Sequence, residues 1–315
     1  MTSSLIPRVS VLMPVFNTQR YVDSAVRSIL QQDHTDFELV ILDDGSTDGS
    51  GAVLQKLAAF DARIRLVQRP NKGLIATRNE LLSLARAELV AWMDSDDISM
   101  KQRLRLQVGR FDADAALVCL GGAALCVDPE GWPLWMERFV TTHDEIVRGQ
   151  QEGGAMRFPT TMMRREAALR VGGFREPFRI GEDLDLCMRL SEVGRMANLD
   201  DVVLEYRQHP RSTSAILSRQ WEVYRDLILA LAHERQAGGP DRLQRGEPVS
   251  VPPPPTAEAA LRDDVHQRRA RMALHEGHVP TARKYARAAL KQQPTSWGAW
   301  KLALRVLASS TRRGK

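Results

Sequence analysis

Three aspartates directly follow an apolar run in the stretch VAWMDSDDISM, residues 90–100. Asp94, Asp96 and Asp97 are close enough in sequence for their carboxylates to lie together. Like charges that close together are unfavourable unless one carboxyl group is protonated or a cation neutralises them. Oxygen ligands suit Mg²⁺ or Mn²⁺, ions that commonly bring phosphates with them. The cluster therefore predicts a metal–diphosphate site and a nucleotide-activated substrate. The alternative is a solvated turn in which Asp96 or Asp97 caps a helix.

Three further polar motifs could share this chemistry. In DDGSTDGS, Asp43 or Asp44 could accept a hydrogen bond from a nucleobase or ribose, or serve only as a turn and helix cap. GEDLDL, residues 181–186, places a carboxylate pair at a helix entry. There the helix N-terminus keeps a carboxylate ionised and able to act as a base, although acids are also common in first turns. His209 follows a strand and is either a ligand or a structural histidine.

An alternation of strands and helices must position these motifs. Patterns with a period of 3.6 residues predict three helices between four strands, the first helix beginning at Asn17 or Thr18. Such alternation predicts a mainly parallel sheet covered by helices, with ligands outside the carboxyl ends of its strands. Both DDG and DSDD are expected at that edge. Strands are predicted at residues 8–14, 37–45, 64–68 and 88–93.

Composition divides the chain into three parts. Residues 1–236 carry the alternating pattern, and residues 237–256 form a Pro/Gly-rich linker. Residues 257–315 predict a small all-α unit of three helices, interrupted at Gly277 and Pro294. The stretch VPTARKYARAALKQQP resembles the second helix of a tetratricopeptide repeat. Because only about one and a half repeats fit, we expect this unit to pack on the body of the protein or on a partner.

The net charge of +5 is unevenly distributed. Residues 256–315 hold 13 Lys/Arg and 4 Asp/Glu, a balance of +9, whereas residues 1–255 hold 31 and 35, a balance of −4. The basic end indicates an anionic membrane surface or an acidic protein as partner, with a solvated helix surface as the alternative. The chain shows neither the ~18 apolar residues of a membrane helix nor a signal peptide. We therefore expect a cytoplasmic protein, at most peripheral at the inner face of a membrane, with no nucleic acid partner.

In their order and spacing, VSVLMPVFN, DDGSTDGS, NKGLIATRN, DSDD, GEDLDL and YRQH resemble the motifs of family 2 glycosyltransferases. The resemblance covers about residues 8–215 and not the helical end. It implies a GT-A fold: a Rossmann-like, nucleotide-binding α/β domain with a mixed central sheet. It also implies a metal-dependent, inverting transfer of a sugar from a nucleotide-sugar, with UDP as the expected nucleotide. The acceptor would be a hydroxyl of a glycan or lipid-linked glycan, in surface polysaccharide or glycan biosynthesis.

The resemblance also implies a role for each matching residue. Asp183 would deprotonate the acceptor, with Glu182 as its neighbour. Asp96 and Asp97 would bind Mn²⁺ or Mg²⁺, with His209 helping to hold the metal or the diphosphate. The donor nucleotide would be bound by Pro14, Val15, Phe16, Asn17, Asp43, Asp44, Arg78, Asp94 and Ser95.

Two other classes of protein were compared with this pattern. Haloacid-dehalogenase-like phosphatases need D-x-D-x-T, and Ile98 stands where the threonine is required. A non-catalytic scaffold, built on a transferase fold with a helical interaction tail, is the remaining alternative.

The QxxRW motif of processive synthases is not matched, because Gln220 and Trp221 are adjacent. We therefore expect transfer of a single sugar.

Overall fold

The computed structural model describes residues 6–152, 154–209, 220–251 and 265–311. The chain forms two compact units. Unit 1 comprises Met1–Ala124, Arg138–Glu205 and Gln220–Pro253. Unit 2 comprises Leu125–Glu137, Tyr206–Arg219 and Pro254–Lys315.

The four strands and three helices predicted for the first hundred residues are confirmed. β2 and β4 are buried along their whole length, which is typical of parallel strands covered on both faces. β1 pairs with β2 and β4, and β2 with β3, all in parallel. The elements are β1 (Val9–Val15), α1 (Val22–Leu30), β2 (Phe37–Asp43), α2 (Ser50–Phe60), β3 (Ile64–Gln68), α3 (Leu74–Leu84) and β4 (Leu89–Trp92).

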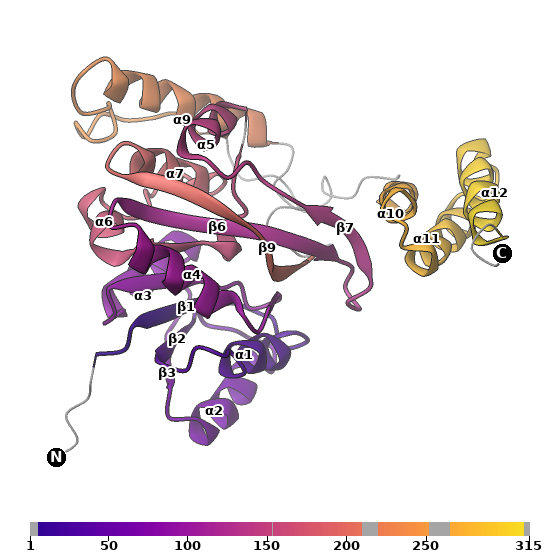
Figure 1. The fold of residues 1–315 in the computed structure, drawn as a ribbon, viewed down its shortest axis with the longest axis horizontal. Coiled ribbons are helices and arrows are strands. Elements are labelled where there is room, and N and C mark those ends of the chain that lie inside the picture. Colours follow the sequence, from indigo (N-terminus) through magenta and orange to yellow (C-terminus); the bar gives the residue numbers. More distant parts are fainter. Residues whose placement is uncertain (1–5, 153, 210–219, 252–264, 312–315) are drawn as a thin grey trace. The chain divides into compact units, whose positions relative to one another are not determined.

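The chain after β4 adds antiparallel strands, so the sheet is mixed, as predicted. Of the elements named below, β7 belongs to unit 2. β8 is antiparallel to both β4 and β6, and the strand order is β3-β2-β1-β4-β8-β6-β9-β5, with β7 paired to β6. The long neighbouring strands β6 and β9 run side by side in Figure 1. The elements are β5 (Ile98–Ser99), α4 (Arg103–Ala113), β6 (Leu117–Val127), β7 (Pro133–Glu137), α5 (His143–Gln151), the 3₁₀ turn η1 (Phe158–Thr160), β8 (Met162–Arg164), α6 (Arg165–Arg170), α7 (Glu182–Ser191), β9 (Arg195–Arg207) and α9 (Trp221–Gln236).

One apolar core of unit 1 joins the sheet to α3, α5, α6 and α7. Its largest side chain is Trp92, at the end of β4, which is almost wholly buried. The ring of Trp92 meets Phe174 edge-on at 5.2 Å between centroids and lies 5.6 Å from Phe158. Aromatic pairs in these arrangements stabilise a core beyond the area they bury. The end of β4, where the aspartate loop begins, is therefore firmly fixed.

The first helix begins later than predicted. Its N-cap is Tyr21, not Asn17 or Thr18. Asn17 has a positive φ of 54°, and its side-chain oxygen accepts a hydrogen bond from the backbone N–H of Thr47 at 2.8 Å. Asparagine tolerates this backbone conformation better than most residues. The side chain therefore ties the loop after β1 to the loop after β2, a long-range use that local capping preferences do not reveal.

The short strands β5 and β8, like β7, were not predicted. β5 has two residues and β8 has three, too few for a periodic pattern. Their position is set by pairing with distant segments: Ile98 lies opposite Glu205, and Met163 opposite Cys119. β5 matters most for the site, because it fixes the far end of the aspartate loop.

Part of the predicted linker, residues 237–251, is folded as part of unit 1. Asp241 is wholly buried and accepts hydrogen bonds from Arg175 at 2.7 Å and from Arg235. A buried carboxylate needs such partners. Arg235 lies just before residues 237–251, but Arg175 comes from a segment that composition could not connect to them. Residues 252–256, which complete the predicted linker, lie outside the described residues.

Unit 2 contains the three predicted helices, α10 (Val265–His275), α11 (Val279–Gln292) and α12 (Trp297–Thr311). They share a small apolar core with Cys126 and Leu134, from the end of the β6–β7 hairpin. In the turn between these strands, the wholly buried Asp128 accepts hydrogen bonds from the Tyr285 hydroxyl at 3.0 Å and from Lys284. The helices therefore pack on a hairpin of the same chain. Their resemblance to a tetratricopeptide repeat stays a prediction.

Candidate active site

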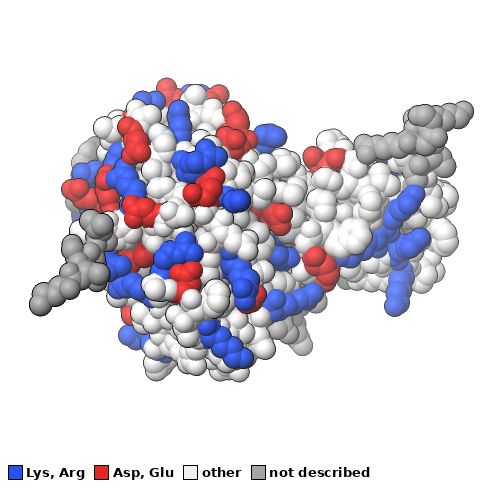
Figure 2. Space-filling view, turned by 60° about the horizontal axis from the view of Figure 1, so that its bottom comes forward, with Lys and Arg blue, Asp and Glu red and all other residues white. Residues whose placement is uncertain are grey.

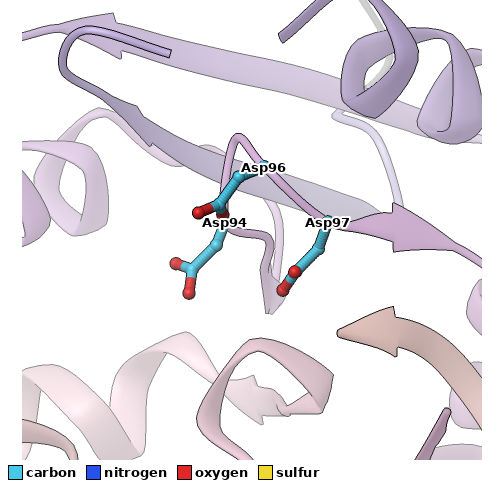
Figure 3. A group of neighbouring side chains, drawn as sticks. All are labelled: Asp94, Asp96 and Asp97. Carbon is cyan, nitrogen blue, oxygen red and sulfur yellow. The ribbon is translucent and has the colours of Figure 1, made fainter. Parts of the chain in front are cut away.

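The three aspartates of the opening motif come together on the loop between β4 and β5 (Figure 3). Asp94, Asp96 and Asp97 each offer a carboxylate oxygen, and these oxygens lie within 4.8 Å of one another. Asp97 is wholly buried, whereas the other two are partly exposed. A set of oxygen donors at this spacing fits a hard divalent cation such as Mg²⁺ or Mn²⁺.

The loop is anchored at both ends. At its start, the Met93 N–H donates to the Leu12 carbonyl at 3.0 Å, and Arg103 donates to the Trp92 carbonyl at 2.8 Å. At its end, Ile98 and Ser99 pair with β9. Arg103 is wholly buried, and burial lowers its pKa to about 10, although the charges of Asp97 and Asp94 oppose this shift. A buried positive charge thus stabilises the acidic loop electrostatically.

Arg78 joins the aspartate loop to the start of α7. One terminal nitrogen donates to Glu182 Oε1 at 2.6 Å, and the other lies 3.9 Å from Asp94 Oδ1. The guanidinium lies over the rings of Phe158 and Phe174, at 4.7 and 5.3 Å from their centroids. Stacking on aromatic faces and pairing with carboxylates are both typical of arginine. The structure therefore places three of the predicted site residues, from three separate motifs, in one cluster.

Two carboxyl groups of this cluster have raised pKa values. Burial raises the pKa of Asp94 to about 6; the positive charge of Arg78 opposes the shift, and the charges of Asp96 and Asp183 add to it. Burial also raises the pKa of Glu182 to about 7, again against Arg78 and assisted by Asp183. Crowded carboxylates behave in this way because each ionised neighbour makes the next ionisation harder. A divalent cation at the aspartate loop would favour the ionised form of Asp94.

The start of α7 is shaped by a glycine and a buried ion pair. Gly181 has a φ of +74°, and a Cβ added there would lie 2.8 Å from the Ile228 Cδ1 atom of α9. Both facts favour glycine at this position. One turn along, Asp185 is wholly buried and accepts a hydrogen bond from Arg189 at 2.6 Å. These contacts fix the first turn of α7, where Asp183 remains partly exposed.

The two aspartates of DDG lie at the end of β2 and are both buried. Asp43 accepts a hydrogen bond from the Gln68 side chain at 3.0 Å. Asp44 accepts one from the Gly73 N–H at 2.9 Å and is paired with Arg69. A carboxylate has about four acceptor positions, so these contacts leave acceptor capacity for a ligand. Both side chains nevertheless have a clear role in holding the loops after β2 and β3.

The remaining residues predicted for the nucleotide lie along the end of β1 and the aspartate loop. Phe16 is half exposed and Pro14 partly buried, but Val15 is almost wholly buried in the sheet. Ser95 is also buried, and its hydroxyl accepts a hydrogen bond from the Thr18 hydroxyl at 3.0 Å. Phe16 and Asn17 are the exposed side chains of this group, and the Asn17 oxygen already accepts the Thr47 N–H, which leaves Phe16 open to a ligand.

His209 lies two residues beyond the end of β9 and belongs to unit 2, where it is buried. Among the described residues, the cluster of potential metal ligands consists of Asp94, Asp96 and Asp97 and does not include this histidine. The predicted role of His209 stays a prediction.

Several residues of the site were missed by the sequence reasoning. Arg69 directly follows β3, at the sheet edge that carries DDG, so its position could have been a signal. Arg103 stands on the buried face of α4, and an arginine among apolar positions was a second signal. The positive charge of Arg157 opposes the rise in the pKa of Asp94, and the ring of Phe158 lies against the Arg78 guanidinium. Neither of these has a local signal, because their neighbours are far away in sequence.

An α/β sheet of this order, with acidic loops along its carboxyl edge, is the arrangement that the motif order predicted. Residues 10–172 match the family model described as glycosyl transferase family 2. The chain therefore belongs to this family. It is 30% identical over 233 residues to TuaG of Bacillus subtilis, which is named for teichuronic acid biosynthesis; the match covers 70% of this chain and 88% of TuaG. It is 29% identical over 217 residues to a chondroitin synthase of Pasteurella multocida, covering 66% of this chain and 21% of that protein.

Two solved structures show the same fold. Residues 1–349 of S. aureus TarS, in complex with UDP-GlcNAc, align with a TM-score of 0.57 at 20% identity, covering 98% of this chain and 92% of that one. The mannosyltransferase PcManGT of Pyrobaculum calidifontis, in complex with GDP-Man and Mn²⁺, aligns with a TM-score of 0.53 at 20% identity, covering 97% and 81%. The predicted GT-A fold is confirmed. The chain spans 21–31% of the length of the chondroitin synthases that it matches.

Proposed function

We propose that this chain is a metal-dependent, inverting glycosyltransferase that moves a sugar from a nucleotide-sugar to an acceptor hydroxyl. The observation that carries this proposal is the link made by Arg78, which joins the aspartate loop to the acidic start of α7. Donor-binding and acceptor-activating groups must face the same reacting carbon, and this arginine brings the two acidic motifs to one place.

Asp96 and Asp97 would hold the cation, with Asp94 beside them. The bound ion would neutralise the charge that develops on the leaving diphosphate. Two observations support the metal: the carboxylate oxygens lie within 4.8 Å of one another, and PcManGT, which shares the fold, was solved with Mn²⁺.

Asp183 would accept the proton of the acceptor hydroxyl. It stands in the first turn of α7 and its side chain is partly exposed, so an acceptor can reach it. Glu182, the neighbouring acid, is engaged with Arg78 and is less suited to the role. Direct attack by the acceptor on the opposite side from the leaving group inverts the anomeric carbon. The acidic residues identified here are sufficient for such a single displacement.

For the donor we propose a UDP-sugar, and for the acceptor a glycan or a lipid-linked glycan. TarS was solved with UDP-GlcNAc, whereas PcManGT was solved with GDP-Man, so the fold admits either nucleotide. Phe16, the half-exposed ring at the end of β1, would stack on the base. The names of TuaG and of the chondroitin synthase support a role in surface polysaccharide biosynthesis.

A screen of nucleotide-sugars tests the proposal. Binding and slow hydrolysis of UDP-, GDP- and dTDP-sugars would be measured by calorimetry and by nucleotide release, with and without Mn²⁺. We expect one donor to bind in a metal-dependent manner and to be hydrolysed slowly. The Asp183→Asn variant should still bind that donor, which separates a loss of chemistry from a loss of binding.

The alternative is a non-catalytic scaffold with a helical interaction tail. It would be favoured if no donor bound in the presence of Mn²⁺ or Mg²⁺ while the chain remained folded by circular dichroism. Binding without any turnover, and without any effect of Asp183→Asn, would point in the same direction.

A further inference from the structure

The outer face of α12 is apolar and exposed. Its two tryptophans and two leucines are between 48% and 67% exposed, a high value for such side chains. They follow one another at i, i+3, i+7 and i+10, which places them on one side of a helix. The opposite side of α12 faces the core of unit 2 through smaller apolar residues. The exposed face consists of Trp297, Trp300, Leu304 and Leu307, and the buried face includes Ala299, Leu302 and Val306.

Basic side chains predominate on the three helices of the unit that carries this face. Residues 265–311 contain nine Lys/Arg and one acid, Glu276, a balance of +8. Figure 2 shows Lys and Arg side chains, without Asp or Glu among them, over the end of unit 2. Lys284 forms ion pairs with Asp128 and Glu130, whereas most of the other basic side chains are exposed. The exposed ones are Arg268, Arg271, Arg283, Arg287, Lys291, Lys301 and Arg305.

The details of α12 match a helix that lies at a membrane–water boundary. The Trp300 indole N–H donates to the Pro294 carbonyl at 2.8 Å, so the polar atom of this ring has a partner while its apolar part faces outward. Lys301 lies 5.3 Å from the centre of the Trp297 ring, and Arg305 follows one turn later. Tryptophan and leucine on one face, flanked by Lys or Arg, are typical of helices that insert into the headgroup region of a bilayer.

We propose that the exposed face of α12 docks on an anionic phospholipid surface. The excess of basic residues favours a partner surface that is uniformly negative, as an anionic lipid surface is. A protein surface normally carries charges of both signs and fits less well. A second copy of the chain is disfavoured, because face-to-face packing would bring Lys301 and Arg305 of both copies together. The inference goes beyond the proposed transfer reaction, and it would hold the enzyme where lipid-linked acceptors are found.

Vesicle flotation of the full chain tests this proposal. The vesicles would contain phosphatidylcholine alone, or phosphatidylcholine with about one third phosphatidylglycerol, at low salt and at about 0.5 M NaCl. We expect flotation with the anionic vesicles, weakened by salt, because screening shortens the range of charge attraction. Flotation with neither kind of vesicle would overturn the proposal, and equal flotation with both would overturn its electrostatic part.

Variants assign the binding to α12. Leu304→Ser/Leu307→Ser removes apolar area from the exposed face, and Lys301→Glu/Arg305→Glu reverses its flanking charge. We expect each double variant to lower the vesicle partition coefficient by roughly tenfold or more. The control is Phe60→Ser, a similarly exposed apolar side chain on α2 of unit 1 that should leave partitioning unchanged. Unchanged binding by both double variants would overturn the assignment.

Two further measurements keep the test independent of other functions. Circular dichroism and donor hydrolysis should be unchanged in the α12 variants, because these residues lie outside the candidate active site. Light scattering of the wild-type chain without lipid distinguishes a second copy as the occupant: a dimer that the leucine variant converts to a monomer would overturn the membrane proposal. If donor binding failed altogether while flotation succeeded, the transferase proposal would fall and the docking proposal would stand.

Discussion

The candidate active site and the helices of unit 2 use charge in opposite ways. At the sheet edge of unit 1, acidic side chains are crowded and largely buried, and arginines such as Arg78 and Arg103 hold them in place. In α10–α12, basic side chains predominate and most of them face outward. The acidic groups at the sheet edge cost stability and are expected where chemistry requires them. The exposed basic groups cost little and act mainly at long range.

The two regions also differ in the interactions that hold them together. The site rests on long-range hydrogen bonds between strand ends, whereas unit 2 has a small apolar core and one buried carboxylate, Asp128, that joins its helices to the β6–β7 hairpin. Substitutions at the sheet edge should therefore affect activity before stability, and substitution of Asp128 should affect stability before activity.

The largest effect is expected for Asp183→Asn. Asparagine cannot accept the acceptor's proton, so kcat should fall by roughly 10²–10⁴, the usual contribution of a general base. Donor affinity and the free energy of unfolding should change little, because Asp183 is partly exposed at the helix start. Initial rates with a saturating donor and an active acceptor would measure the loss.

The matched control for Asp183→Asn is Asp226→Asn. Asp226 lies on α9, and its side chain is 67% exposed. Its substitution should leave kcat within about twofold, as expected for surface changes away from the site. If Asp183→Asn retained normal turnover, the assignment of the base would be wrong.

The second effect concerns the metal. Asp97→Asn removes a buried carboxylate from the cluster, and we expect it to weaken Mn²⁺ binding by roughly a hundredfold. Excess Mn²⁺ should partly restore turnover in this variant, because the defect lies in affinity. Mn²⁺ titration followed by electron paramagnetic resonance would give the Mn²⁺ dissociation constants of the wild-type chain and of the Asp97→Asn variant.

Asp33→Asn serves as the control for the metal prediction. Asp33 pairs with Arg105 at 2.9 Å on the surface, away from the aspartate loop. Its substitution should leave Mn²⁺ affinity unchanged. Equal Mn²⁺ affinities for wild type and Asp97→Asn would show that this residue is not a ligand.

How far the sequence predicts this molecule differs between the same two regions. The period of the apolar residues predicts the first strands and helices and the three helices of unit 2, because each of these is long enough to show a pattern. The motif order predicts which acidic residues meet at the sheet edge. These features depend on local sequence or on general rules of parallel sheets.

The features that the sequence does not predict all depend on distant partners. Arg78 and Glu182 are 104 positions apart, and Asp128 and Tyr285 are 157 apart. The two-residue strand β5 exists because β9 lies beside it. Pro/Gly-rich composition predicts a linker at residues 237–256, but the buried Asp241 within it binds Arg175, 66 positions away. Pairing energies of this kind outweigh local preferences.

The third effect is on the stability of unit 2. Asp128→Ala leaves the Tyr285 hydroxyl and the backbone N–H groups of Glu130 and Trp132 without the acceptor that they share. Loss of a buried, charged acceptor of this kind should cost about 3 kcal/mol of unfolding free energy. Urea unfolding followed by tryptophan fluorescence would measure it.

Glu130→Gln is the matched control for the unit 2 prediction. Glu130 also binds Lys284, at 2.8 Å, but its side chain is 47% exposed. An exposed ion pair of this kind is worth about 0.5 kcal/mol or less. Equal losses in the two variants would contradict the view that the buried carboxylate holds the helices to the hairpin.

The smallest effect, about 2 kcal/mol, is the pH dependence of stability that Glu182 introduces. Burial raises its pKa from the ordinary 4.5 to about 7, so between these values the folded chain keeps a proton that the unfolded chain has lost. Because the folded state binds more protons in this window, stability must fall as pH rises through it.

Glu182→Gln cannot titrate and can still accept a hydrogen bond from Arg78 through its amide oxygen. Urea unfolding between pH 5 and 8, in EDTA, should therefore show a flatter decline for this variant than for wild type. The decline from Asp94, whose pKa is raised to about 6, should remain, so the curve flattens without becoming level. The control is Glu166→Gln, at an exposed position on α6, which should give the same pH dependence of stability as the wild type. Parallel curves for wild type and Glu182→Gln would show that Arg78 keeps Glu182 ionised throughout this range, and the cluster would then be a permanent ion pair.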